Sequence, residues 1–494
     1  MESSPSRGFW VLESGLVWIP TVVRRVLLSL VIALLAATAD ATDRYVSTSG
    51  SGSVCTLAKP CALSDAFTNG GGVRISPGDV VWLRGGTYTN SNTGYKFTQS
   101  VSGTALATIT YRAYPGERVV IDANGAADAP YGAIHVLGSW VVYRELEVID
   151  SDPGRPGVSS LHNAPGGFFI AHGEGATSVA FINNVIHDTG GDGIALFSDG
   201  DMVVYGNVFY YNGSLSNQQH CIYFNQSVGS ANSQLIANNI LFDAKGYNLH
   251  GYGFHNRVTL KSNITFQAGR LASDIPSGAE LLLGTARGAG PPGTNILIDS
   301  NYGYAADAKG IGAHIGYQAG NDLIQITNNY FVGGAMRFNS TLGAHAVMSG
   351  NFLQGPMFNE GVAHEPTSAQ WPGNTLQDGG GRPASGQKVV VIPNTFETGR
   401  CNVAIYNWEH SATVPVDLST CLRVGDEFAV YWAPKFATKN AAITGNYAGG
   451  SVSFPMTTAA LGTMPNPFYA AMMQPPTTTL PEFAAFVVQA TRRN

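Results

Sequence analysis

Two segments of the sequence, Ser233-Gln-Leu-Ile-Ala-Asn-Asn239 and Arg257-Val-Thr-Leu-Lys-Ser-Asn263, share one pattern. Each alternates apolar and polar residues over about five positions, which is the period of a half-buried β-strand. Each then ends in Asn, a residue that tolerates the left-handed backbone conformation of a turn. The pattern therefore predicts a short strand followed by a turn.

The pattern recurs along residues 140–351. Six further segments share it: Trp140–Leu146, Ser178–Asn184, Asp201–Asn207, Asn295–Asn301, Leu323–Asn329 and Ala344–Asn351. Seven of the eight segments end in Asn, at intervals of 23, 32, 24, 38, 28 and 22 residues. Such a period indicates a repeat architecture, in which the short intervals give the length of one coil and the long ones contain inserted loops.

Stacked coils would place the terminal Asn residues in a column, about 4.8 Å apart, where each side-chain amide can bond its neighbours. We expect this column to be a structural ladder and not a site. A β-propeller or β-sandwich would instead need antiparallel hairpins, and Asn-Gly or Asp-Gly two-residue turns do not recur between these strands.

A second strand follows the Asn turn in most coils. The segments that predict it are Ala133–Leu137, Gly167–Ala171, Gly193–Phe197, Cys221–Asn225, Asn248–Tyr252, Glu280–Gly284, Gly312–Gly316 and Ala335–Asn339. Alternation along these strands predicts an outward-facing column made of His135, Phe169, Ala195, Tyr223, His250, Leu282, His314 and Arg337. A neighbouring column holds Asn225 and Tyr252.

These repeats resemble the right-handed parallel β-helix superfamily of pectate-lyase-like proteins over roughly residues 44–358. The segments Tyr45-Val-Ser-Thr-Ser-Gly50 and Pro77-Gly-Asp-Val-Val-Trp-Leu-Arg-Gly-Gly-Thr-Tyr88 are similar to the first coil of many such proteins, with a capping helix at about Leu63–Thr68. The resemblance implies a fold more than an activity, because the superfamily includes lyases, hydrolases, epimerases and non-enzymes.

The chain is expected to be an all-β protein of two domains, a right-handed parallel β-helix over 42–358 and a small antiparallel β-sandwich over 387–494. A turn-rich linker is predicted over 359–386. Short strands at sandwich-like spacing predict the second domain, and Asn402-Val-Ala-Ile-Tyr-Asn-Trp408 carries a resemblance to the small β-sandwich at the C-terminus of many carbohydrate-active enzymes.

Residues 1–41 are typical of a secretory signal peptide, with two arginines, an apolar run over Val26–Ala37 and a small-residue cleavage site. The apolar run is short for a bilayer span, and an uncleaved anchor is the alternative. Export fits the cysteines: Cys55 and Cys61 are close enough for a local bridge, Cys401 and Cys421 can pair, and Cys221 is expected to be a buried free thiol.

Composition narrows the function classes. The 494 residues include 60 Gly and 25 Pro with only 12% charged residues, as expected of short strands joined by tight turns. The formal net charge of −6 and the lack of a Lys/Arg cluster make nucleic acid an unlikely partner. We therefore expect a secreted, periplasmic or cell-surface monomer that has no membrane contact after signal cleavage and takes a polysaccharide as its partner.

The first candidate site lies where Tyr223 and His250 occupy one outward column on adjacent coils. A His or Tyr can remove the proton α to a uronate carboxylate, and an amide or Arg can stabilise the charge that develops. The residues expected to contact the substrate are His220, Asn225, Tyr252, His314 and Arg337. The structural alternative is an ordinary polar outer sheet, since His and Tyr are common on solvent faces.

The second candidate site is an acidic stretch made of His187-Asp-Thr-Gly-Gly-Asp-Gly-Ile194 and Ser198-Asp-Gly-Asp201. Asp188 and Asp192 could act as the acid and base of a hydrolase, or bind Ca²⁺, the one cofactor that the sequence suggests. Gly-Asp-Gly is also a common turn in β-helices. The motif sets of polygalacturonases and of pectate lyases with Arg-x-Pro-x-x-Arg are absent, as is zinc-ligand spacing.

The sequence therefore favours a polysaccharide lyase or epimerase that acts on a uronate-containing polymer through Tyr223 and His250. One alternative is a glycoside hydrolase that uses Asp188 and Asp192. The other, from a different class, is a non-catalytic carbohydrate-binding or surface protein.

Overall fold

The computed structural model describes residues 41–493 except 93, 125–131, 153–165, 215–218, 272–277, 285–290, 292, 307–309, 318–320, 340–344, 361–370, 380 and 469–473. All but the last residue of the predicted signal peptide, 1–41, therefore lie outside the described residues. No helix in the described part of the chain is long and apolar enough to cross a membrane.

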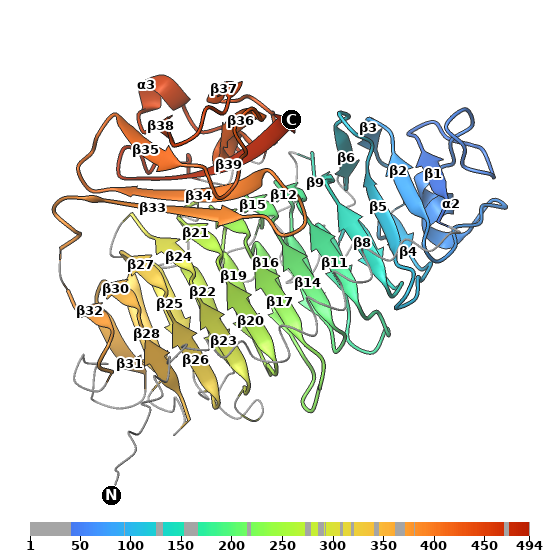
Figure 1. Ribbon diagram of the computed structural model, residues 1–494. Helices are drawn as coiled ribbons and strands as arrows, with labels where there is room; N and C mark the ends of the chain where they lie inside the picture. Colours follow the sequence, from blue (N-terminus) through green and yellow to red (C-terminus); the bar gives the residue numbers. More distant parts are fainter. Residues whose placement is uncertain are drawn as a thin grey trace, which may run out of the picture.

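Three long parallel sheets run the length of the first domain (Figure 1). Sheet 1 consists of β1 (Asp43–Val46), β2 (Val80–Leu83), β5 (Ile109–Ala113), β8 (Val141–Arg144), β11 (Val179–Ile182), β14 (Met202–Tyr205), β17 (Gln234–Ala237), β20 (Val258–Lys261), β23 (Ile296–Asp299), β26 (Ile324–Thr327) and β29 (Val347–Ser349). Sheet 2 consists of β4 (Phe97–Gln99), β7 (Ile134–Val136), β10 (Phe168–Ile170), β13 (Ile194–Phe197), β16 (Ile222–Asn225), β19 (Leu249–Tyr252), β22 (Ala279–Gly284), β25 (Ile311–Ile315), β28 (Ala335–Asn339) and β31 (Met357–Glu360). Sheet 3 consists of β3 (Gly86–Tyr88), β6 (Val119–Asp122), β9 (Glu147–Ile149), β12 (Val185–His187), β15 (Val208–Tyr210), β18 (Ile240–Phe242), β21 (Ile264–Phe266), β24 (Tyr302–Tyr304), β27 (Tyr330–Val332), β30 (Phe352–Gln354) and β32 (Thr375–Gln377).

Each strand pairs in parallel with the equivalent strand one coil later, so the first domain is a right-handed parallel β-helix, as the sequence predicted. Sheet 1 contains the strands predicted before the Asn turns, and sheet 2 contains the second strands. Sheet 3 was not predicted. Its strands are mostly three residues long and follow the turn Asn directly, and a short apolar run such as Val208-Phe-Tyr210 was their only signal in the sequence.

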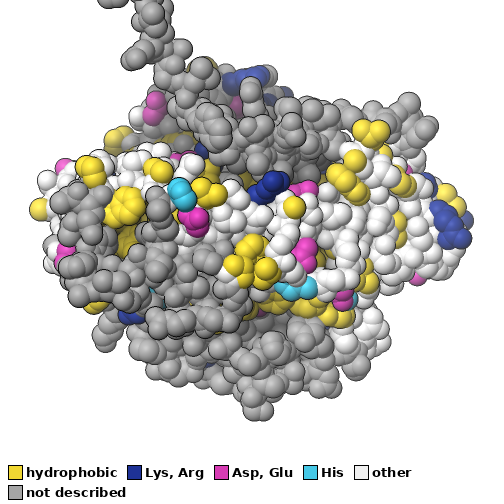
Figure 2. Space-filling view, turned by 90° about the horizontal axis from the view of Figure 1, so that it is seen from below, with side chains coloured by type: hydrophobic (Ala, Val, Ile, Leu, Met, Phe, Trp, Pro, Cys, Tyr) yellow, Lys and Arg dark blue, Asp and Glu magenta, His cyan; other side chains and the backbone are white. Residues whose placement is uncertain are grey.

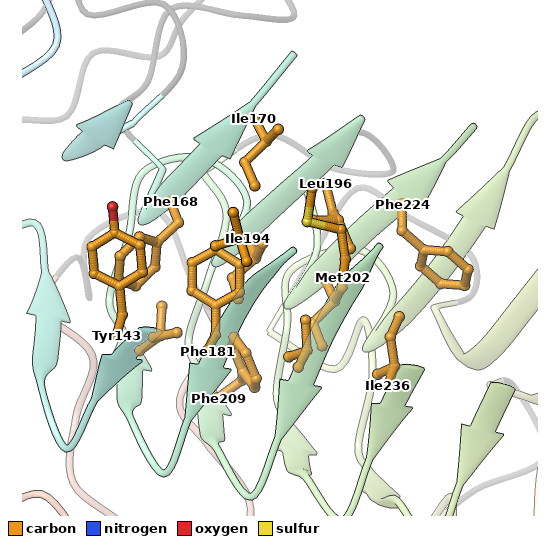
Figure 3. Close-up of a cluster of buried hydrophobic side chains, with 14 of the residues drawn as sticks. Tyr143, Phe168, Ile170, Phe181, Ile194, Leu196, Met202, Phe209, Phe224 and Ile236 are labelled. Carbon is orange, nitrogen blue, oxygen red and sulfur yellow. The ribbon is translucent and has the colours of Figure 1, made fainter. Parts of the chain in front are cut away.

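The interior of the solenoid is filled by side chains from all three sheets. Figure 3 shows aromatic and aliphatic residues from neighbouring coils pointing toward one another. Tyr143 and Phe181, one coil apart on sheet 1, stack with ring centroids 5.6 Å apart, and Phe168 of sheet 2 packs 4.7 Å from Phe181. The side chains predicted to point inward from β13 and β16, such as Ile194 and Phe224, are fully buried. This alternation is what leaves their neighbours on the outer face.

The predicted Asn ladder is confirmed. Each side-chain amide donates to the Oδ1 of the Asn on the next coil at 2.7–3.0 Å, and each Oδ1 also accepts a backbone N–H. The ladder runs through Asn184, Asn207, Asn239, Asn263, Asn301, Asn329, Asn351 and Asn374. Its last member was not predicted. The amides satisfy buried turn backbone groups that would otherwise lack partners, so their role is structural.

The first coil is closed by α2 (Leu63–Thr68), at the predicted position. Phe67 of this helix is fully buried, with its ring centroid 4.8 Å from that of Tyr111 on sheet 1. The predicted disulfide between Cys55 and Cys61 is present beside the helix, and Cys221 is a buried free thiol, as expected.

The C-terminal domain is antiparallel, as predicted. Its main sheet has the order β33 (Gln387–Pro393), β34 (Arg400–Asn407), β39 (Phe483–Arg492), β36 (Glu427–Trp432) and β37 (Ile443–Asn446). A ribbon of β35 (Thr413–Asp417) and β38 (Ser451–Pro455) packs on it through Phe454, whose ring centroid lies 5.0 Å from that of Phe486. The short helices are η1 (Ala433–Lys435) and α3 (Thr458–Leu461), and the predicted disulfide joins Cys401 and Cys421.

The C-terminal domain lies along sheet 3 (Figure 1), with which it shares one hydrophobic core. Phe483 stacks on Tyr304 of β24 with centroids 4.8 Å apart, and Tyr406 packs 4.8 Å from Tyr330 of β27. The outer face of sheet 3 is therefore apolar and covered from β12 to β27. No strand of sheet 2 contributes to this shared core, so the C-terminal domain leaves the outer face of sheet 2 open to a ligand.

The solenoid continues past residue 358, into the segment predicted as a linker over 359–386. β32, which lies within that segment, pairs with β30 of the preceding coil. Near the end of the segment, Arg382 donates to the backbone carbonyl of Ala305 and to the hydroxyl of Tyr304, each at 3.0 Å. These contacts tie the connection to the solenoid.

Candidate active site

The outward column predicted on sheet 2 is confirmed by the strand register. Its members pair directly from coil to coil in the order His135, Phe169, Ala195, Tyr223, His250, Leu282, His314 and Arg337. The register depends on inward residues such as Ile222 and Leu249, because a slip by one residue would turn the apolar set outward.

Tyr223 of β16 and His250 of β19 lie in contact at the centre of this column. Their ring centroids are 4.7 Å apart and the rings are nearly parallel, at 13°. His220 packs edge-on against both rings, and Tyr247 stacks on His220 at 5.1 Å with an angle of 4°. Tyr252 lies on the other side of His250, at 5.7 Å. Two histidines and three tyrosines thus form one cluster on two adjacent coils.

A chain of hydrogen bonds determines the protonation of the two histidines. The backbone N–H of Tyr247 donates to Nδ1 of His220 at 3.0 Å, so this nitrogen carries no proton. The proton of the neutral His220 ring is therefore on Nε2, which donates to Nδ1 of His250 at 2.6 Å. The proton of His250 is consequently on its own Nε2. The pair offers a ligand an N–H donor at His250 and no lone pair.

Burial keeps both rings neutral. Burial holds the pKa of His220 well below its usual range, and the repulsion that a protonated His250 would exert lowers this pKa further. Burial lowers the pKa of His250 to about 3, with added contributions from His255 and His314. His250 is thus a poor proton acceptor at pH 7, whereas the sequence assigned it proton transfer. The geometry favours hydrogen-bond donation by His250 instead.

Asp192 belongs to this cluster, although the sequence paired it with Asp188. Its Oδ1 accepts the backbone N–H of His220 at 2.7 Å. The side chain is half-buried, and burial raises the pKa of its carboxyl well above the usual range, against the effect of the His220 N–H. A carboxyl with a raised pKa is suited to acid–base catalysis.

Tyr223 is held in its protonated form. Burial, followed by the charge of Asp192 and then Tyr252, raises the pKa of its phenol. The side chain still reaches the surface, as it is only half-buried. Tyr223 can therefore donate a proton beside a carboxylate that can accept one.

The neighbouring column borders the cluster with polar groups. Nδ2 of Asn225 donates to the backbone carbonyl of Tyr252 at 3.1 Å, and its Oδ1 lies 2.7 Å from Nε2 of His172. His172 is exposed, and its Nδ1 lies 3.5 Å from Oδ2 of Asp199. His172 was not predicted, because it lies beyond the end of β10, where the alternation of the strands no longer applies. Asp199 was predicted only as part of the acidic stretch and not as a neighbour of the sheet 2 cluster.

Aromatic rings extend from the cluster along sheet 2 in both directions. Toward the N-terminal coils, Phe197 packs 4.9 Å from Tyr223 and 6.1 Å from Phe169, and Tyr95 stacks on His135 at 4.0 Å. On the face opposite the C-terminal domain (Figure 2), histidine and acidic side chains lie among apolar ones. Rings of this kind suit the flat faces of sugars.

The chain is similar to two lyases of solved structure. They are the pectate lyase Pel9A, at 16% identity and a TM-score of 0.44 over 72% of this chain and 84% of that one, and a rhamnogalacturonan lyase, at 17% and 0.43 over 68% and 87%. The complex of XylC with xylose is similar at 10% identity and a TM-score of 0.45, over 90% of this chain and 99% of that one. No protein-family model and no curated protein matches the sequence.

Asp188 lies apart from this cluster, under the C-terminal domain. Its Oδ2 is 2.7 Å from Nδ1 of His187, and its Oδ1 accepts the backbone N–H of Phe468 at 2.7 Å. Glu147 is 3.0 Å from Nε2 of the same histidine. Both carboxylate oxygens of Asp188 are thus engaged in a buried network, and the predicted pair of Asp188 with Asp192 is not formed.

Three predicted contact residues occupy different places. His220 is fully buried, so it can act on a ligand only through His250. His314 is buried and separated from His250 by Leu282 in the column. Arg337 lies at the far end, with its guanidinium 5.6 Å from the ring centroid of Phe358. Tyr247, which orients the histidines, was not predicted because it lies in the turn before β19.

A metal site remains a prediction. Among the described residues, no group of three or more His, Cys, Asp or Glu side chains could hold a metal ion. Binding of the Ca²⁺ ion that the sequence suggests therefore has to be tested by experiment.

Proposed function

We propose that this protein is a polysaccharide lyase that cleaves a uronate-containing chain on sheet 2. One observation carries the proposal: Tyr223 and Asp192 flank a neutral histidine pair whose hydrogen bonds orient an N–H donor at His250. The two disulfides are of the kind that forms outside the cytoplasm, so we place the activity in a secreted, periplasmic or cell-surface protein.

The reaction would be a β-elimination. The Nε2–H of His250 donates to the uronate carboxylate and stabilises the charge that develops there. The carboxylate of Asp192 accepts the proton α to that group, and the bond to the glycosidic oxygen breaks as the carbon–carbon double bond forms. Tyr223 donates its proton to the leaving oxygen. Each cleavage then yields one unsaturated uronate and one new reducing end.

The pH dependence follows from the same groups. Asp192 must be ionised to act as a base, so activity rises with pH through its raised pKa. His250 contributes no loss between pH 7 and 5, because its pKa is about 3. An Asp192→Glu variant is expected to keep weak activity with a shifted pH–activity profile. If activity falls at the same acidic pH in this variant as in the wild type, Asp192 is not the base.

The test is incubation with a panel of uronans and neutral polysaccharides, with ultraviolet absorbance of unsaturated uronate and reducing ends measured in parallel. A rise in both supports the lyase. Reducing ends alone indicate a hydrolase, a change in uronate configuration without cleavage an epimerase, and binding without either a carbohydrate-binding protein. Each of these three outcomes contradicts the proposal.

Variants test the assigned residues. Tyr223→Phe and Asp192→Asn are each expected to lower kcat by about 10²–10⁴-fold, the usual contribution of a general acid or base. Asp322→Asn, which replaces an exposed carboxylate outside the cluster, should retain wild-type activity. Activity that survives Tyr223→Phe and Asp192→Asn combined would refute the site.

A further inference from the structure

A cavity lies away from sheet 2, between the early coils and the C-terminal domain. It has a volume of about 320 Å³, at the small end of the range of ligand pockets. The solenoid contributes the turn before β6 and the turns at Glu145 and Asn183, and the C-terminal domain contributes Arg400, Lys439 and Gln489. In Figure 1 the C-terminal domain ends near β9 and β12, and the first coils extend beyond it.

The carboxylates that line this cavity already have cationic partners. The ion pairs join Glu117 to Arg84, Glu145 to Arg112 and Arg144, and Glu147 to Arg118. The side chain of Arg118 is 61% exposed, so the cavity is open to solvent at this side. None of these three carboxylates forms an ion pair with Lys439, although Glu147 and Glu145 are close enough to raise the pKa of its ammonium.

Two of those cations share one aromatic ring. The ammonium of Lys439 lies 3.6 Å from the ring centroid of Phe436, and the guanidinium of Arg400 lies 5.3 Å from it. Lys439 donates to Oε1 of Gln489 at 3.3 Å and forms no ion pair with a described carboxylate. Packing around the ammonium, and then the charge of Arg400, lower the pKa of Lys439 to about 7, although the side chain keeps contact with solvent.

Arg400 has a hydrogen-bond donor left over. Its side chain is 2% exposed, its Nη2 donates to the carbonyl of Gly206 at 3.1 Å, and its Nη1 lies 3.4 Å from Glu397. Its Nε is buried with no hydrogen-bond partner among the described residues. A buried donor of this kind would be stabilised by an acceptor that reached it.

We propose that this cavity binds a single anionic sugar residue, a hexuronate or the uronate end of a short oligosaccharide. Lys439 and Arg400 would hold the carboxylate. The carboxylates of Glu117 and Glu145 line the same cavity and can accept hydrogen bonds from sugar hydroxyls. The mixture of cations with many acceptors in a small volume fits one anionic group and several hydroxyls better than an inorganic anion. The site is separate from the sheet 2 cluster and uses none of its residues.

The test is calorimetric titration of the full chain with D-glucuronate and D-galacturonate, with glucose and sulfate as matched probes. Binding of the uronates alone is expected, and Lys439→Gln should weaken it at least tenfold. Lys388→Gln, the same change elsewhere on the C-terminal domain, should leave uronate affinity unchanged. A crystal soaked with the uronate should show it between Lys439 and Arg400.

Three results would overturn this inference. They are equal affinity for glucose or sulfate, no change of affinity in Lys439→Gln, or a soaked uronate that lies on sheet 2 and not in the cavity. Because these experiments measure binding only, they remain decisive if no polymer is cleaved. Conversely, Lys439→Gln should cleave polymer at the wild-type rate, so failure of the cavity and failure of the lyase are distinguishable.

Discussion

Docking of the C-terminal domain is expected to depend on pH through His187. This buried ring lies between Asp188, at 2.7 Å, and Glu147, at 3.0 Å, and Asp188 in turn accepts the backbone N–H of Phe468 from the C-terminal domain. Burial alone would lower the pKa of His187, but the hydrogen bonds to Asp188 and Glu147 outweigh it and raise the pKa to about 8.

The sign and size of the effect follow from linkage. The pKa is raised above its unfolded value of 6.5, so the stabilisation is fully present below pH 6.5 and is lost as pH rises through about 8. The difference between 6.5 and about 8 corresponds to about 2 kcal/mol of unfolding free energy. His187 is buried and stacked on Tyr210 at 4.4 Å, so solvent does not screen this charge appreciably.

The assay is denaturant unfolding of the wild type and of His187→Gln at pH 6 and pH 9. The stability gap between them should shrink by about 2 kcal/mol at the higher pH, because only the wild type loses the charged interaction. His410→Gln, the same change at a ring that is 57% exposed, should show a gap near zero at both pH values. A gap between wild type and His187→Gln that stays constant would refute the reasoning.

Three further predictions concern the scaffold and the histidine pair. Asn239→Ala leaves the buried backbone N–H of Asn207 without its side-chain acceptor, so it should cost about 1–3 kcal/mol in denaturant unfolding, while exposed Asn446→Ala should cost almost nothing. Nitrogen NMR of the ring of His250 should show a neutral imidazole with its proton on Nε2 down to about pH 4, given a pKa of about 3; a charged ring at pH 6 would contradict the hydrogen-bond chain. Replacing both members of the Cys401–Cys421 bridge by Ser should cost about 2–4 kcal/mol, and no change in the thermal midpoint would show that the bridge is dispensable.

The repeat made much of the fold predictable. The segments that end in Asn207 and Asn239 give the order of the coils, and the period-two alternation of the second strand in each coil then pairs Tyr223 with His250. The register of the outward column and the Asn ladder follow from that local rule. Each disulfide is also local, since it joins cysteines 6 or 20 residues apart.

Features that depend on turns and on the second domain were not predictable in this way. The backbone of turns follows no fixed period. The N–H of Tyr247, which sets the tautomer of His220 and through it that of His250, therefore could not be predicted from a sequence pattern. The same holds for Asp192, which the sequence grouped with Asp188 four residues away. The chain turns between them, so that one faces sheet 2 and the other the C-terminal domain.

The sequence by itself determined the solenoid, its register and the Tyr223–His250 contact, because these arise from short-range alternation repeated coil after coil. Only the tertiary structure decided which nitrogen of His250 carries the proton, which carboxylate joins it, and that Arg400 and Lys439 meet the early coils in a common cavity. Those outcomes depend on burial and on contacts between residues up to hundreds of positions apart. The interaction free energies that decide these outcomes arise only when the whole molecule is packed, so they are not encoded in any one segment.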